Sequence, residues 1–308
     1  MDEGCPYTYS RCVQGPWILE ASRRLALYPE SAAQFVNWLG IRPGDHFSEV
    51  GCGTGAVCRW VAQAGSFRGI GLEKDRRLVH AARRLARSAG LTNRLWFVEG
   101  DACRLPFPDN SFDACFAFAL LHYACGDARK ILIEMVRVVK PASTIATVHP
   151  IDECPLPPQA ENGALSSEIA ELERILFDCT DKLIAYRLKD YRQMCWRDAA
   201  ATLEEITGSR VRLRGFFFPT YPEELVSDEY ARYLERQRRE LVRRAQFIAR
   251  LAGGAESKGR SAVEGYVGRL ASLYAQRAEF MKAQHRAGTR NYCWTAPPRL
   301  VIIAKKVA

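Results

Sequence analysis

The 308-residue sequence lacks the features of membrane-spanning and secreted proteins. No uninterrupted apolar run approaches the roughly 18–20 residues that cross a bilayer. The start, Met1-Asp2-Glu3-Gly4, is acidic and has no apolar core of the kind found in signal peptides. We therefore expect a soluble, cytoplasmic protein without a membrane span. The 48% hydrophobic and 26% charged residues are ordinary for a globular chain.

Paired cysteines are also missing from the sequence. Eleven cysteines are present, but no two of them form a Cys-x-x-Cys pair. Their number is odd, and several fall in expected strands or helices. Reduced thiols that act as small hydrophobic side chains are therefore the favoured interpretation, ahead of disulfides or zinc. We expect no metal site.

The net charge of +9 favours anionic partners without establishing one. The most basic segment is 229–250, with seven arginines against three glutamates. Its arginines are interleaved with an apolar stripe, and Glu235 and Glu240 fall on its polar face. A solvated helix is therefore favoured over a nucleic-acid site, which the sequence does not exclude.

Short apolar runs alternate with amphipathic runs in the first half of the chain, a pattern typical of the α/β class with a doubly wound parallel sheet. The expected strands are 46–51, 69–73, 95–99, 112–118 and 144–149, with helices at 54–64, 74–89 and 127–139. Further helices are expected at 16–28, 30–39 and 196–207, and further strands at 211–218 and 299–305.

Three regions follow from these patterns. Residues 1–40 form an N-terminal helical segment, 41–220 and 296–308 form a Rossmann-like domain, and 221–295 form a helical insertion. The insertion contains two amphipathic patterns separated by Gly253-Gly254, which predicts a helical hairpin. It would cap a substrate cavity, supply a homodimer surface, or simply enlarge the core.

The stretch Phe47-Ser48-Glu49-Val50-Gly51-Cys52-Gly53-Thr54-Gly55 predicts a buried strand, a glycine turn and the start of a helix. Glycines allow a ligand to approach the main chain closely, and a helix N-terminus offers free amide donors. The turn also satisfies the dinucleotide fingerprint through Gly51-x-Gly53-x-x-Ala56, with Glu73 about twenty residues on. On that motif alone, a nicotinamide cofactor remains open.

Further motifs decide between the cofactors. Glu49 precedes the first glycine, Glu73 ends the second strand, and Glu99-Gly100-Asp101-Ala102 ends the third. The runs 105–113 and 135–141 follow at suitable spacing. Together these motifs resemble the class I S-adenosylmethionine-dependent methyltransferases, especially the branch similar to the ubiquinone and menaquinone biosynthesis enzymes. The resemblance covers residues 41–150 and implies S-adenosyl-L-methionine as the cofactor.

The resemblance also implies residue roles. Glu49 would lie near the methionyl amino group, Glu73 would accept the ribose hydroxyls, and Asp101 would accept the adenine amino group. The implied cofactor residues are Glu49, Gly51, Cys52, Gly53, Gly55, Glu73, Lys74, Asp101, Ala102, Ala117 and Phe118. Two departures from the family pattern are Ser48, at a normally apolar position, and Phe118, which favours an apolar or aromatic substrate environment.

Methyl transfer from a sulfonium is an in-line displacement, so that much of the catalysis can come from positioning. A base is needed only where the acceptor loses a proton. The candidates are His122, at a position where relatives commonly have histidine, then His149 at the end of the fifth expected strand, and Tyr123. The alternative for His122 is a cofactor-side or packing role, and for His149 it is packing.

The methyl acceptor is expected to be a small apolar or aromatic metabolite. The segment 117–120 lacks the polar residue and Pro-Pro-aromatic sequence of nucleobase amino methyltransferases. Cys154-Pro155 follows the fifth expected strand rather than the fourth, which argues against cytosine-C5 chemistry. An RNA or protein methyltransferase and a non-catalytic cofactor-binding scaffold remain the alternatives.

Overall fold

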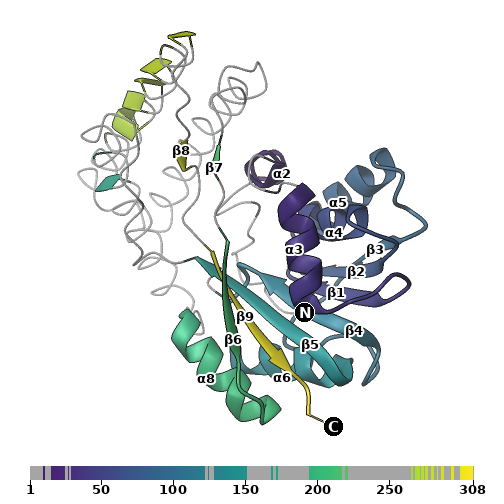
Figure 1. Ribbon diagram of the computed structural model, residues 1–308. Coiled ribbons are helices and arrows are strands. Elements are labelled where there is room, and N and C mark those ends of the chain that lie inside the picture. The colour runs from purple at the N-terminus through teal and green to yellow at the C-terminus, as the bar shows by residue number, and fades with distance from the viewer. Residues whose placement is uncertain are drawn as a thin grey trace, which may run out of the picture. The chain divides into compact units, whose positions relative to one another are not determined.

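The computed structural model (Figure 1) describes most of the sheet-forming part of the chain. The described residues are 10, 15–24, 27, 29–121, 124, 128–150, 168, 171–172, 194–216, 219–220, 265, 268–270, 272–273, 275–276, 279–280, 283, 286–287, 293–294 and 299–307. The chain divides into two compact units, one with residues 27–154, 190–217 and 297–308, the other with 1–26, 155–189 and 218–296.

A seven-stranded sheet in the order β3-β2-β1-β4-β5-β9-β6 forms the centre of the first unit. The strands are β1 His46–Val50, β2 Arg68–Glu73, β3 Leu95–Glu99, β4 Phe112–Phe118, β5 Val139–Pro150, β6 Arg212–Phe216 and β9 Arg299–Lys305. β1 to β5 run parallel, whereas β9 is antiparallel to both β5 and β6. The predicted α/β class with a doubly wound sheet is confirmed, and the predicted strand 299–305 runs antiparallel to its neighbours, a direction that the prediction did not include.

Helices cover both faces of this sheet (Figure 1). They are α3 Pro29–Leu39, α4 Ala56–Gln63, α5 Arg76–Ser88, α6 Ala128–Val138 and α8 Trp196–Thr207. α4 and α5 pack on β2 and β3 with α3 beside α4, while α6 and α8 pack together over β4, β5 and β9. The core under α6 and α8 includes the fully buried Leu132, Met135 and Ile302.

The strand order creates a switch point between β1 and β4. After β3 the chain crosses from the β3-β2-β1 side of the sheet to β4 on the opposite side of β1. In open α/β sheets, ligands bind outside the carboxyl ends of the strands at such a point. The glycine turn that follows β1 therefore lies where the fold favours a ligand.

Most element boundaries agree with the sequence patterns, and the largest difference is at β5. The predicted strand began at residue 144, whereas β5 begins at Val139. Val139 pairs with Phe112 before a register shift, and the Ala142 amide donates to the Lys306 carbonyl. These pairings extend the strand through Pro141, in the segment between the predicted helix 127–139 and the predicted strand 144–149.

The second unit contains α2 Pro16–Arg24 and a short antiparallel pair, β7 Pro219–Thr220 and β8 Cys293–Trp294. This division differs from the predicted regions, because residues 27–40 group with the sheet and 155–189 group with the insertion. The predicted hairpin helix at 229–250 lies outside the described residues. Within the described ranges, no helix has the length and apolar character of a membrane span.

Candidate functional site

Three glycines shape the turn between β1 and α4. Gly51, Gly53 and Gly55 have φ values of 71°, 56° and 71°, in the left-handed region that disfavours side chains. A Cβ atom at Gly55 would lie 2.4 Å from Cε1 of Phe97. Glycine is therefore required there both by the backbone and by the packing of β3 beneath the turn.

Glu73, at the end of β2, connects this turn to α5. Its Oε2 accepts a hydrogen bond from the Gly53 amide at 2.9 Å, and its Oε1 accepts one from the Asp75 amide at 2.9 Å. Burial raises the pKa of this carboxyl above its ordinary value, although the two amides act in the opposite direction. Each oxygen retains a second lone pair that can accept a ligand hydroxyl.

Glu49 lies below the same turn and is fully buried. Its Oε2 accepts a hydrogen bond from the thiol of Cys58, in the first turn of α4, at 2.9 Å. Burial raises the pKa values of Cys58 and Cys52, so both thiols stay protonated at neutral pH. Five cysteines are free thiols, namely Cys52, Cys58, Cys103, Cys115 and Cys195, and within the described ranges no three metal-ligating side chains gather as a metal site.

Asp101 follows the end of β3 and is exposed. Its Oδ1 accepts a hydrogen bond from the Cys103 amide at 2.9 Å, and Lys74 Nζ lies 3.6 Å from its Oδ2. The Gly100 amide donates to the Glu73 carbonyl at 3.1 Å, which links the ends of β2 and β3. The fold thus places Glu49, Glu73 and Asp101 at or next to the carboxyl ends of three neighbouring strands, and their contacts with a cofactor stay predictions.

Ala117 and Phe118 end β4 and are buried. The Phe118 ring packs edge-on against Phe35 of α3, with ring centres 6.4 Å apart. Phe35 also contacts the rings of Trp60 and Phe116. The side chain of Phe118 therefore belongs to an aromatic core, which differs from the expectation that it lines a substrate environment. Its backbone remains a candidate for the cofactor site.

His149 is the one predicted catalytic side chain within the described ranges. It lies next to the carboxyl end of β5, is buried, and its Nε2 is 3.1 Å from Thr147 Oγ1. His122 and Tyr123 lie outside the described residues. The structure thus places one candidate base at the expected edge of the sheet, and its catalytic role stays a prediction.

Sequence reasoning missed Arg59 of α4. Its guanidinium is buried and donates from Nη1 to the Thr54 carbonyl at 2.7 Å. This bond satisfies a carbonyl of the glycine turn from the first turns of the helix. The available signal was an arginine within the otherwise mostly apolar run 56–62.

Residues 48–147 match the family model described as a methyltransferase domain. This segment is a methyltransferase domain. The match confirms the class I methyltransferase resemblance and does not single out the ubiquinone and menaquinone branch.

Curated relatives match about a third to almost half of the chain. The chain is 32% identical over 138 residues to the sterol 24-C-methyltransferase erg6 of Aspergillus fumigatus, covering 45% of this chain and 35% of the relative. It is 36% identical over 108 residues to the cycloartenol-C-24-methyltransferase of Arabidopsis thaliana, covering 35% and 32%. The chain thus spans about a third of the length of these relatives.

Solved structures share the fold of the methyltransferase domain. The YcgJ protein of Bacillus subtilis aligns with a TM-score of 0.52 at 17% identity, covering 91% of this chain and all of that one. The phosphoethanolamine N-methyltransferase 2 of Haemonchus contortus, in complex with S-adenosyl-L-methionine, aligns with a TM-score of 0.53 at 13% identity, covering 97% and 59%. At these identities the likeness shows the fold alone.

Proposed function

We propose that the chain is an S-adenosyl-L-methionine-dependent methyltransferase with a small apolar methyl acceptor. The observation that carries this proposal is the glycine turn flanked by Glu49, Glu73 and Asp101, at the carboxyl ends of β1, β2 and β3 within a methyltransferase domain. When bound, the cofactor supplies an electrophilic methyl group on a sulfonium.

The residues of the site fit the cofactor. Gly51, Gly53 and Gly55 present no Cβ, so that the main chain can lie against the methionyl part. Glu73 holds the turn and has lone pairs left for two ribose hydroxyls. Asp101 is exposed at the end of β3, where it can accept the adenine amino group. Three carboxylates also suit a cofactor that carries a sulfonium and an ammonium.

A sterol-like acceptor is favoured by the named activities of the relatives, which include sterol and cycloartenol 24-C-methyltransferases. An apolar acceptor of this kind is oriented chiefly by shape, and enclosure excludes water from the displacement. Where the reaction releases a proton, His149 is the proposed base, with His122 and Tyr123 as further candidates. An acceptor-binding role for 221–295 remains part of the same proposal.

The test uses the purified full chain. Isothermal titration with S-adenosylhomocysteine should show binding that Glu73→Ala abolishes. Transfer of a labelled methyl group from S-adenosylmethionine to detergent-dispersed cycloartenol should then exceed transfer to RNA or to a protein mixture. Absence of cofactor binding would reject the proposal. Transfer to RNA would instead favour the polymer alternative through 229–250, and binding without any transfer would favour the scaffold.

A further inference from the structure

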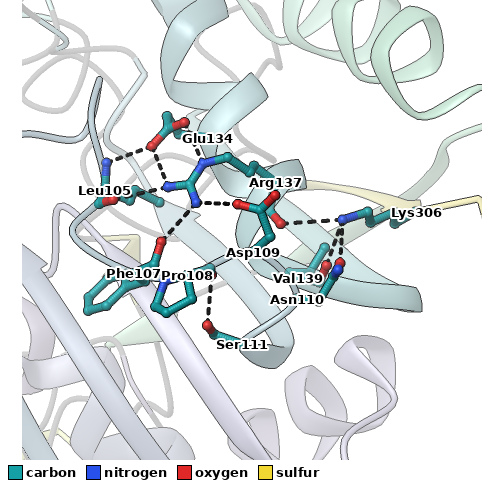
Figure 2. Close-up of polar contacts among 10 residues, drawn as sticks. All are labelled: Leu105, Phe107, Pro108, Asp109, Asn110, Ser111, Glu134, Arg137, Val139 and Lys306. Atoms are coloured by element: carbon teal, nitrogen blue, oxygen red, sulfur yellow. Dashed lines mark hydrogen bonds and ion pairs between the residues drawn. The ribbon is translucent and has the colours of Figure 1, made fainter.

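Arg137, near the C-terminal end of α6, holds the loop between β3 and β4 (Figure 2). Its Nη2 donates to the Leu105 carbonyl at 3.0 Å, and its Nη1 donates to the Phe107 carbonyl at 2.8 Å and to Asp109 Oδ1 at 2.7 Å. Its Nε and Nη2 donate to the Glu134 carboxylate, each at 2.7 Å. The guanidinium thus makes five hydrogen bonds, three of them to the loop.

Glu134 completes this arrangement one helical turn earlier. Its Oε2 also accepts the Leu105 amide at 2.7 Å, so that both backbone groups of Leu105 bind the Glu134–Arg137 pair. The hydrogen bonds from Arg137 hold the pKa of the Glu134 carboxyl below its ordinary value, which keeps it charged at neutral pH. We call Glu134, Arg137 and their three loop partners the Arg137 clamp.

The clamp closes a short loop that carries Asp101 and Ala102. At the first end, the Gly100 amide donates to the Glu73 carbonyl at 3.1 Å. A Cβ atom at Gly100 would lie 3.8 Å from Cδ of Pro106, so the two ends of the loop are adjacent. The clamp binds the backbone of Leu105, which directly precedes Pro106.

The loop has a second support that the clamp does not supply. The Leu105 side chain is buried in the same core cluster as Leu72. Loss of the clamp therefore leaves the loop attached through its side chain, but releases the backbone at its closing end. Such a loop can shift without the domain unfolding.

We propose that Arg137 is a positioning residue for adenine recognition, acting through the backbone of Leu105 on Asp101 and Ala102. This inference rests on the proposed function. A carboxylate and an amide would recognise the adenine edge through hydrogen bonds. Such bonds weaken steeply when the donor–acceptor distance or angle leaves a narrow range. Arg137 itself does not contact the reacting atoms.

The test compares two arginine-to-lysine variants on the same helix. Arg137→Lys keeps the charge but loses the planar fork that binds five acceptor sites. Arg129→Lys is the matched control, because Arg129 makes a bidentate pair with Glu205 of α8, at 2.7 and 2.6 Å, away from the loop. Isothermal titration measures the Kd of S-adenosylhomocysteine and of S-inosylhomocysteine, in which an oxo group replaces the adenine amino group.

Arg137→Lys should raise the Kd of S-adenosylhomocysteine by at least about fivefold, the lower end of coupling between separate sites. It should also reduce the preference for S-adenosylhomocysteine over S-inosylhomocysteine, since Asp101 reads the amino group. Arg129→Lys should leave both quantities unchanged. A general loss of stability in a variant would instead raise the Kd of the two ligands by the same factor, so that the preference between them would not change.

Three results would overturn the inference. The first is an Arg137→Lys variant that binds both ligands like the wild type, which leaves the proposed function intact. The second is an equal loss of discrimination in Arg129→Lys. The third is a wild type that binds no S-adenosylhomocysteine, which rejects the proposed function as well. If Arg137→Lys does not fold, Asp109→Asn, at an exposed carboxylate, should give a smaller change in the same direction, and unchanged discrimination would refute the role.

Discussion

Replacement of Gly55 by alanine should destabilise the domain much more than replacement of Gly90. Both glycines have left-handed backbones, with φ values of 71° and 68°. An alanine in this region costs about 1–2 kcal/mol at either position. The two sites differ in space, because a Cβ at Gly90 meets no atom within 4 Å, whereas at Gly55 it would lie 2.4 Å from Cε1 and 2.6 Å from Cζ of Phe97.

The Phe97 ring cannot easily move away from a Cβ at residue 55. It is 4% exposed, and a Cβ at Gly55 would also lie 3.3 Å from Cβ of Ala82. Overpacking of a core typically costs about 1–3 kcal/mol. Gly55→Ala should therefore lower the free energy of unfolding by about 2–5 kcal/mol, the sum of the strain and overpacking terms, and Gly90→Ala by the strain alone.

Urea-induced unfolding of the two variants, followed by tryptophan fluorescence, measures this difference. Thermal unfolding should show the same order, with about 2–4 °C lost per kcal/mol for a domain of this size. Equal losses of stability in the two variants would refute the argument, because they would show that the packing of Phe97 under the turn adds nothing to the backbone strain.

Two further predictions concern buried and charged groups. Ser48→Ala should leave stability unchanged or raise it by up to about 1 kcal/mol in the same urea assay. The reason is that, among the described residues, the fully buried hydroxyl makes no hydrogen bond beyond a weak interaction with the Cys115 thiol on the neighbouring strand. A clear loss of stability would contradict this. The folded-state pKa of Glu134 is lower than its ordinary value of 4.5, so the charged carboxylate stabilises the fold fully above about pH 4.5. This contribution is lost as the pH falls from about 4.5 through the folded-state pKa. Glu134→Gln should therefore show a flatter acid limb in thermal unfolding from pH 7 to pH 3 than the wild type, and identical limbs would show that the Arg137 bonds do not stabilise the carboxylate.

Local patterns in the sequence were sufficient for the elements and for the position of the glycine turn. The strands 95–99, 112–118 and 299–305 and the helix 196–207 agree with β3, β4, β9 and α8. Their apolar periods and turn residues depend on neighbours within a few positions, which a single sequence displays directly. The acids at or next to the carboxyl ends of β1, β2 and β3 were also readable, since parallel strands end at one edge.

Tertiary structure alone decided which groups meet. The run 299–305 reads as a buried strand in either direction, and only its pairing with β5 and β6 made β9 antiparallel. Phe118 entered an aromatic core because α3 brings Phe35 against it. The bonds of Arg137 to Leu105, 32 positions away, likewise depend on how α6 packs on the sheet. The sequence by itself determined where strands, turns and the acids near the strand ends occur; long-range packing, which local periodicity does not encode, decided their partners.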